Sequence, residues 1–102
     1  MRVIKKPTIL EFCKVHPQAK QQLLAWYEEA KHAHWTSCED IRTRFKTADC
    51  PNDHIVIFDI KGNRYRLIIR IHYANENSKG VVFIRWFGSH AEYDKIKDLE
   101  KI

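Results

Sequence analysis

Three arginines and a histidine share one side of a predicted strand, and this part of the chain is the best suited to chemistry. Successive side chains of a strand point to opposite sides, so residues 64–72 divide into two sets. One set is apolar. The other contains Ile68 together with Arg64, Arg66, Arg70 and His72. Because arginine forms forked contacts with phosphate oxygens, this side of the strand is predicted to bind a polyanion.

His90 and Tyr93 lie at the start of a helix that the sequence predicts for residues 90–99. Ser89 and Glu92 form the pattern of a capping box there, and the free amides of a helix N-terminus bind anions. Residues three apart share a helix face, so the two side chains lie together. Since histidine transfers protons near neutral pH, the pair is a candidate for acid–base chemistry on an anion.

Arginines, a histidine and a tyrosine without a carboxylate cluster suit one reaction class in particular. Magnesium needs carboxylate ligands, so we expect neither a metal ion nor a cofactor. In metal-independent RNA cleavage the ribose 2′-OH attacks the adjacent phosphorus. A base removes its proton, an acid protonates the leaving 5′-oxygen, and cations stabilise the phosphorane. On these residues alone, simple binding of RNA or DNA and a role in protein interaction stay open.

The positive charge is concentrated in the second half of the chain. The protein has 102 residues and a formal net charge of +5. Residues 60–90 hold one acid, Glu76, and six basic residues: Lys61, Arg64, Arg66, Arg70, Lys79 and Arg85. A neutral scaffold with one basic segment indicates a polyanion site. Simple alternation groups Arg85 with Phe83 and Phe87, so its side of the sheet stays open.

The first half of the chain is predicted to be helical. Residues 7–15 carry apolar side chains at helical spacing, and His16-Pro17 interrupts them. A second amphipathic helix starts at Pro17. Its apolar face holds Leu23, Trp26, Tyr27 and Ala30. Thr36 and Glu39 form a capping-box pattern that opens a short third helix.

The second half changes to the alternation that is typical of strands. The predicted strands are residues 54–60, 64–73 and 81–87, with a further short one at 2–5. Lys61-Gly62-Asn63 is a hairpin turn, because Gly and Asn tolerate positive φ, and Gly88 ends the last strand. This order predicts a single α+β domain over residues 1–102: N-terminal helices pack on one face of a small antiparallel sheet, and a C-terminal helix follows.

The cysteines and the hydropathy bear on the compartment. Three cysteines without a C-x-x-C motif make a disulfide framework unexpected. His32 and His34 would point apart on a helix, so with Cys38 they are not expected to bind zinc. No apolar run approaches the length that spans a bilayer, and charge follows Met1 directly. We therefore expect a soluble cytoplasmic protein without a membrane partner.

Two segments of the chain resemble the HigB family of type II toxins. Residues 54–69 contain the hairpin pattern F-x-I-x-G-N-x-x-R-L-I, and residues 83–96 contain the helix start S/T-H-x-E-Y-D. The long helix that carries Trp26 is similar as well. The resemblance implies the fold of RelE and ParE, in which helices pack against one face of an antiparallel sheet.

The resemblance also implies an activity and a partner. The protein would be the toxin of a toxin–antitoxin system that cleaves mRNA, often on the translating ribosome, and so inhibits translation. Its partner would be a HigA-like antitoxin with a helix-turn-helix domain, and operator DNA would be bound only through the complex of the two. Two other functions stay open: a ParE-like toxin that binds gyrase without nuclease chemistry, and a non-enzymatic RNA-binding module.

The matching positions carry the following expected roles. Arg66 stabilises the phosphate, His90 transfers a proton, and Tyr93 transfers a second proton or orients the site. Asn63 belongs to the turn rather than to the chemistry. The secondary RNA contacts are expected at Arg64, Arg70, Arg85 and Lys95.

Overall fold

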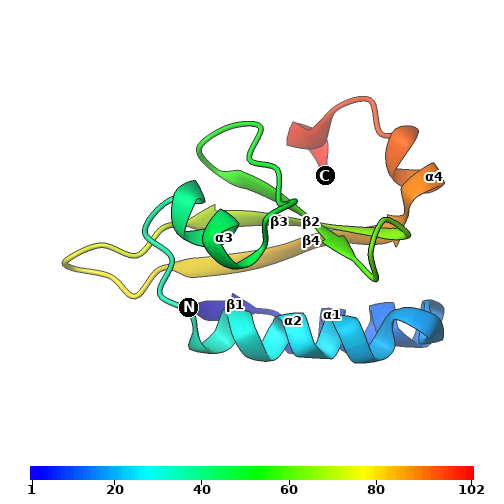
Figure 1. The fold of residues 1–102 in the computed structure, drawn as a ribbon, viewed down its shortest axis with the longest axis horizontal. Helices are drawn as coiled ribbons and strands as arrows, with labels where there is room; N and C mark the ends of the chain where they lie inside the picture. The colour runs from blue at the N-terminus through cyan, green and yellow to red at the C-terminus, as the bar shows by residue number, and fades with distance from the viewer.

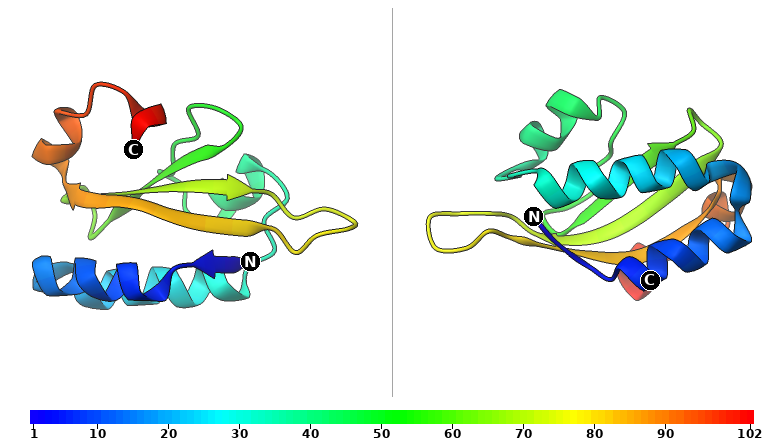
Figure 2. Two further views of the ribbon diagram at one scale, coloured as in Figure 1. Left: turned by 180° about the vertical axis from the view of Figure 1, so that it is seen from behind. Right: turned by 90° about the horizontal axis from the view of Figure 1, so that it is seen from below.

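Two N-terminal helices lie side by side against one face of a four-stranded sheet, and the C-terminal segment lies on the other face (Figures 1 and 2). The computed structural model describes residues 1–102. The strands are β1 (Arg2–Ile4), β2 (Ile55–Ile60), β3 (Tyr65–His72) and β4 (Val81–Ser89). The helices are α1 (Lys6–Val15), α2 (Lys20–His32), α3 (Cys38–Arg44) and α4 (His90–Asp94), with 3₁₀ turns at Pro17–Ala19 and Leu99–Lys101. The α+β class is confirmed.

The main core fills the space between α1, α2 and the sheet. The predicted apolar face of the second helix is buried at Leu23, Trp26, Tyr27 and Ala30, and the apolar side of β3 meets it through Leu67, Ile69 and Ile71. Trp26 and Trp35 are core residues that pack on Phe58. The apolar residues of α2 recur at helical spacing and those of β3 at every second position, so the core lies where the sequence predicted it.

The sheet has the order β1-β4-β3-β2, and it is mixed rather than purely antiparallel. β2, β3 and β4 form the expected antiparallel meander. The predicted N-terminal strand exists as β1, but it pairs parallel to β4, with Arg2 opposite Val81. Parallel pairing is possible because three helices and two strands separate β1 from β4 in sequence, which is ample chain for a crossover.

The β2–β3 hairpin confirms the predicted turn, except that Lys61 rather than Asn63 adopts positive φ beside Gly62. Ile60 pairs with Tyr65, so four residues make the connection. Lys61 and Gly62 adopt positive φ, at 56° and 67°. Asn63 does not, and its side chain is used for another contact described below.

α3 begins one residue later than the capping-box pattern suggested. Ser37 is the N-cap, and its Oγ accepts a hydrogen bond from the amide of Asp40 at 3.3 Å. Thr36 instead donates its own amide to the Asp40 carboxylate at 2.9 Å. Asp40 therefore replaces Glu39 as the acidic partner at this helix start.

Cys38 and Cys50 form a disulfide, so the expectation of no disulfide is wrong. After α3 the chain turns back toward the start of this helix, and the two Cα atoms lie 6.4 Å apart. This approach depends on tertiary folding, which cysteine spacing alone does not reveal. Cys13 is the free cysteine and is buried. No group of side chains is arranged to hold a metal ion, and no helix is long and apolar enough to cross a bilayer.

The C-terminal region differs most from the sequence prediction. β4 continues through Gly88 to Ser89, and α4 ends at Asp94 instead of Leu99. The last turn of α4 tightens, because the amides of Lys95 and Ile96 bond three residues back. The helix then stops, and a separate 3₁₀ turn begins with Asp98 as its cap.

The far face of the sheet carries a second, smaller apolar cluster. Ile55, Ile57 and Ile68 are fully buried there. They are covered by partly buried side chains of β4 and the C-terminal segment: Trp86, Tyr93, Ile96 and Leu99. The face that was predicted to be basic is therefore apolar at its centre, and its arginines stand at either end.

Candidate functional site

Arg66 is held rigidly at the start of β3, on the face opposite the helices. Its Nε lies 3.1 Å from Oδ1 of Asp59, the residue directly across the hairpin. Its Nη2 donates to Oδ1 of Asn63 at 2.7 Å, and Nη1 donates to the main-chain oxygens of Asn63 and Tyr65 at 3.2 and 3.3 Å. Only 11% of the side chain is exposed. The guanidinium is thus fixed in position by its own hairpin.

Tyr93 lies beside this guanidinium. The centre of its ring is 5.8 Å from Cζ of Arg66 and 6.4 Å from the ring centre of Trp86. Burial raises the pKa of the Tyr93 phenol, and the nearby Asp49 carboxylate adds to this effect. The phenol is therefore protonated at neutral pH, so it is able to donate a proton and poorly able to accept one.

His90 stands at the rim of the same region, with 42% of its side chain exposed. Its Nε2 is 3.4 Å from Oδ1 of Asp94, one turn further along α4. The main-chain amide of His90 donates to the oxygen of Arg64 at 2.9 Å, which ties α4 to the hairpin. An accessible imidazole with a carboxylate to orient it has the properties of a general base.

The amides at the start of α4 do not form the anion site that the sequence suggested. The capping box is complete: the amide of Ser89 donates to Oε1 of Glu92 at 2.9 Å, and the amide of Glu92 donates to Oγ of Ser89 at 3.1 Å. Hydrogen bonds from the amide of Ser89, and then from its side chain, hold the pKa of the Glu92 carboxyl below its usual range. A carboxylate already occupies this position, and the helix has only five residues.

Gly88 has a positional role next to these residues. It pairs with Arg66 inside the β3–β4 ladder. A Cβ atom at this position would lie 2.6 Å from the ring of Trp86 and 3.1 Å from Oε1 of Glu92. The absent side chain lets both groups pack against β4, which brings α4 close to Arg66.

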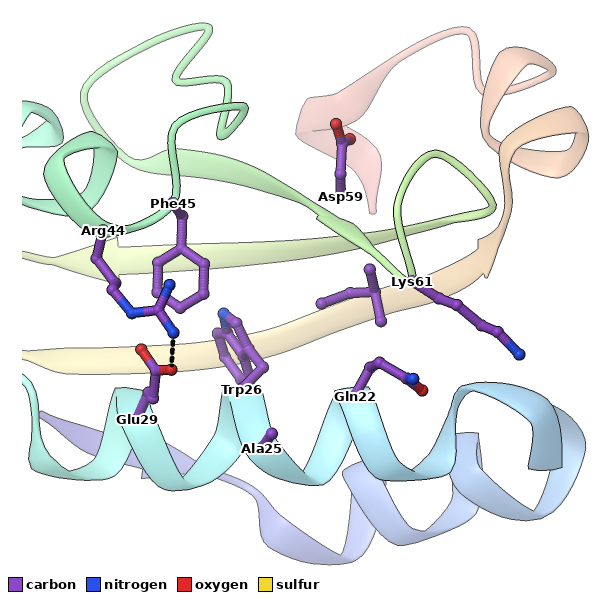
Figure 3. A pocket seen from close by; sticks show the side chains of 9 residues that line it. Gln22, Ala25, Trp26, Glu29, Arg44, Phe45, Asp59 and Lys61 are labelled. Carbon is purple, nitrogen blue, oxygen red and sulfur yellow. Dashed lines mark hydrogen bonds and ion pairs between the residues drawn. The ribbon is translucent and has the colours of Figure 1, made fainter.

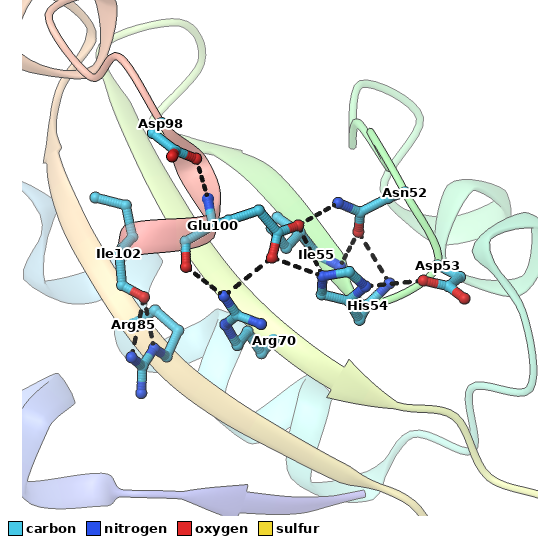
Figure 4. A network of polar contacts seen from close by, with 9 residues as sticks. All are labelled: Asn52, Asp53, His54, Ile55, Arg70, Arg85, Asp98, Glu100 and Ile102. Atoms are coloured by element: carbon cyan, nitrogen blue, oxygen red, sulfur yellow. Dashed lines mark hydrogen bonds and ion pairs between the residues drawn. The ribbon is translucent and has the colours of Figure 1, made fainter.

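Arg70 and Arg85 lie at the other end of the same face (Figure 4). Arg70 donates from Nη2 to the main-chain oxygen of Glu100 at 2.7 Å. Arg85 donates from Nε and Nη2 to the main-chain oxygen of Ile102, at 3.1 and 2.9 Å. Both arginines are therefore bound to the last residues of the chain.

A β-bulge resolves the open question about Arg85. Ile68 pairs with Trp86 but Ile69 pairs with Ile84, so Arg85 is an extra residue in β4. Beyond the bulge the alternation is reversed. Phe87 consequently lies in the main core while Arg85 faces the C-terminal segment, and the simple parity that grouped them fails.

Three other candidates remain in solvent. The side chains of Arg64 and Lys95 are exposed and form no hydrogen bond or ion pair. Lys95 follows Tyr93 by two residues in the chain, and the main chain of Arg64 bonds to the amide of His90. His72 is exposed at the far end of β3 and packs edge-on against Phe83. The structure therefore brings Arg66, His90 and Tyr93 into one region and leaves His72 outside it.

Sequence reasoning missed the acidic and amide partners of these residues. Asp59 was detectable, because a hairpin that pairs Ile60 with Tyr65 must pair Asp59 with Arg66. Asn63 was noticed only as a turn residue. Glu100 gave no signal, since its contacts cross 30 residues of sequence or more.

A hollow of about 210 Å³ lies between α2, α3 and β2 (Figure 3). Trp26, Phe45 and Ile60 line it, and an ion pair between Arg44 and Glu29 lies at its rim. Its charged lining is completed by Asp59 and Lys61, and Asp59 is the same residue that holds Arg66.

Comparison with known protein families shows the family to which the chain belongs. The model of the HigB toxin family, described as the RelE-like toxic component of a toxin–antitoxin system, matches residues 19–96. The chain belongs to the HigB toxin family. No curated protein matches its sequence. Membership makes the protein the toxin of a toxin–antitoxin pair, with an antitoxin as its partner.

The matched segment of this HigB-family toxin runs from α2 to just beyond α4. It includes Arg66, His90 and Tyr93. The contacts that Glu100 and Ile102 make with the sheet lie beyond it.

Proposed function

We propose that this toxin is a metal-independent endoribonuclease that cleaves mRNA on the translating ribosome and thereby stops translation. The observation that carries the proposal is the fixed guanidinium of Arg66 beside the protonated phenol of Tyr93, with the imidazole of His90 on the same short helix. Its antitoxin is a HigA-like protein with a helix-turn-helix domain, and the complex of the two binds operator DNA.

Each of the three residues has a distinct task in the reaction. His90 removes the proton of the ribose 2′-OH, whose oxygen attacks the adjacent phosphorus. The bond from phosphorus to the 5′-oxygen breaks, and Tyr93 protonates the leaving oxygen. The products are a 2′,3′-cyclic phosphate and a 5′-hydroxyl. Arg66 stabilises the negative charge of the phosphorane, as preorganised donors do in a dry site.

The hydrogen bonds of Arg66 leave room for this task. Its contacts with Asp59 and Asn63 Oδ1 fix the plane of the guanidinium. The two contacts of Nη1 are longer, at 3.2 and 3.3 Å, and go to main-chain oxygens. A phosphate oxygen is a stronger, charged acceptor, so it would replace them without moving the guanidinium.

Primer extension tests the proposal. An mRNA is incubated with the toxin, with and without ribosomes, beside the His90→Ala variant. Cuts that need ribosomes and disappear in the variant support translation-coupled cleavage. Cuts on mRNA without ribosomes would show that cleavage does not require the ribosome, contrary to this part of the proposal. No cuts in either condition would contradict nuclease activity and leave gyrase binding or plain RNA binding as the function.

A further inference from the structure

Glu100 lies at the centre of a network of N–H donors on the far face of the sheet (Figure 4). Its Oε1 is 2.8 Å from Nε2 of His54 and accepts from Nδ2 of Asn52 at 2.9 Å. Its Oε2 is 3.0 Å from Nε2 of His54 and 3.3 Å from Nη2 of Arg70. One carboxylate therefore satisfies an amide, an imidazole and a guanidinium at once.

The donors in this network are well suited to a phosphate. Nδ1 of His54 is 2.8 Å from Oδ1 of Asp53, so both ring nitrogens face carboxylates, which favours the protonated imidazolium. Arg70 adds a second positive charge, and Arg85 on the neighbouring strand adds a third. Toward Glu100 these groups act as hydrogen-bond donors, as a phosphate oxygen requires, while Oδ1 of Asn52 accepts from the amides of His54 and Ile55.

The residues that fill this position are held weakly. The side chain of Glu100 is 50% exposed, and that of His54 is 40% exposed. Residues 98–102 form a single 3₁₀ turn, and Leu99 is their only apolar contact with the second cluster. Surface ion pairs contribute little to stability, and segments with few buried contacts open readily. A ligand of higher charge is able to displace this segment.

We propose that Asn52, His54, Arg70 and Arg85 form a second phosphate subsite, for the backbone of the RNA strand, which Glu100 occupies in the free toxin as an internal phosphate mimic. The proposal rests on the proposed function and names a second contact of the same RNA. It adds His54 and Asn52 to the RNA site and gives residues 98–102 the role of a displaceable competitor.

The position of the subsite along β3 fits a single RNA strand. Arg66 and Arg70 are four residues apart on the same side of β3, a separation of about 13 Å. Ile68 and Trp86 lie between them, and Trp86 is only partly buried. A strand with one phosphate at Arg66 and another at Arg70 would pass over this aromatic residue, where a base is able to stack.

The direct test measures RNA affinity after removal of the Glu100 charge. Glu100→Gln and the matched control Glu76→Gln each remove one negative charge from an exposed side chain, the second in the loop between β3 and β4. The probe is a 2′-O-methyl oligoribonucleotide, which cannot be cleaved because its 2′-oxygen carries no proton. We expect Glu100→Gln to tighten binding at least threefold and Glu76→Gln to leave it unchanged. Equal affinity of the two variants would overturn the proposal.

A second measurement is independent of RNA. Inorganic phosphate is titrated into the wild type and into Glu100→Gln, and the ring signals of His54 are followed by NMR. The proposal predicts that phosphate shifts these signals at lower concentration in the variant, and that Arg70→Gln in the variant removes the effect. His54 signals that do not respond in Glu100→Gln would overturn the subsite.

The two proposals fail in different ways. A toxin that cuts no RNA, but whose Glu100→Gln variant binds phosphate more tightly, contradicts the proposed nuclease and keeps the subsite. If the toxin cuts RNA, but the wild type and Glu100→Gln bind RNA with the same affinity, the proposed nuclease activity stands and the subsite is contradicted.

Discussion

The two ends of β3 use the same residue type in different ways. Arg66 is fixed by neighbours within seven residues of it in sequence and is 11% exposed. Arg70 is bound by Glu100, thirty residues away, and is 31% exposed. Local contacts form whenever the hairpin forms, whereas distant ones depend on a weakly held segment. One end is thus preorganised for chemistry, and the other is open to exchange of partners.

The largest effect is expected from Arg66→Ala, which removes the fixed end of this pair. Loss of a preorganised donor to the phosphorane slows cleavage by about 10²–10³-fold. The measurement is the rate of mRNA cleavage in the primer-extension assay. A variant that still binds its antitoxin but cuts at the wild-type rate would contradict the role of Arg66.

Tyr93→Phe keeps the ring next to Arg66 and removes only the proton donor. We expect the rate to fall by about 10²-fold, within the usual range for acid–base catalysis. Because the pKa of Tyr93 is raised above the ordinary value of 10.0, the phenol stays protonated up to higher pH than a free tyrosine. The protonation of Tyr93 therefore does not limit cleavage by the wild type at neutral pH. At very high pH the phenol loses its proton and the wild-type rate falls, whereas Tyr93→Phe should not show this fall.

Asn63→Ala tests positioning rather than direct chemistry. The substitution removes the 2.7 Å bond to Nη2 of Arg66, and we expect roughly a tenfold lower maximal rate, as for loss of one hydrogen bond to a charged group. RNA affinity should change little, and Asn63→Asp, which keeps the acceptor, should restore the rate. A loss of affinity at an unchanged maximal rate would show that Asn63 contacts RNA itself.

The smallest effect concerns pH at the exchangeable end. Hydrogen bonds with Glu100, and then with Asp53, raise the pKa of His54 above its ordinary value of 6.5. A raised pKa means that the contribution of this contact is full below pH 6.5 and is lost as the pH rises through the raised pKa. Amide hydrogen exchange within residues 98–102 should accelerate over that interval, beyond the intrinsic increase with pH.

The matched variants sharpen this last prediction. Glu100→Gln should lower the pKa of His54 and remove the additional acceleration of exchange, while Glu76→Gln should change neither. NMR titration of the His54 ring follows the first effect directly. An unchanged titration in Glu100→Gln would show that Asp53 alone holds the imidazolium.

The parts of the fold that sequence could predict are those set by local periodicity. The faces of α2 and β3 follow from the spacing of Leu23, Trp26, Leu67 and Ile69, and the hairpin follows from Gly62 and its neighbours. The parallel pairing of β1 is a long-range contact between segments with no local marker. The Cys38–Cys50 disulfide depends on the return of the chain after α3.

The candidate site divides along the same line. Arg66, His90 and Tyr93 could be proposed as candidates from the sequence because they lie in short motifs and on predictable faces. The bulge at Arg85 was not predictable, because a single extra residue reverses the alternation without any marker in the sequence. The network around Glu100 was missed because α4 was expected to continue to residue 99, which would have carried Glu100 away from β3.

The most direct test of the central claim separates rate from affinity at the two ends of β3. Single-turnover cleavage is measured on ribosomes programmed with one short mRNA, over a range of toxin concentrations, for the wild type, Arg66→Ala and Arg70→Gln. The account predicts that Arg66→Ala lowers the maximal rate, while Arg70→Gln raises the concentration for half-maximal rate and leaves the maximum unchanged. If both variants altered the same parameter to the same extent, the division of the strand into a catalytic end and an exchangeable binding end would be contradicted.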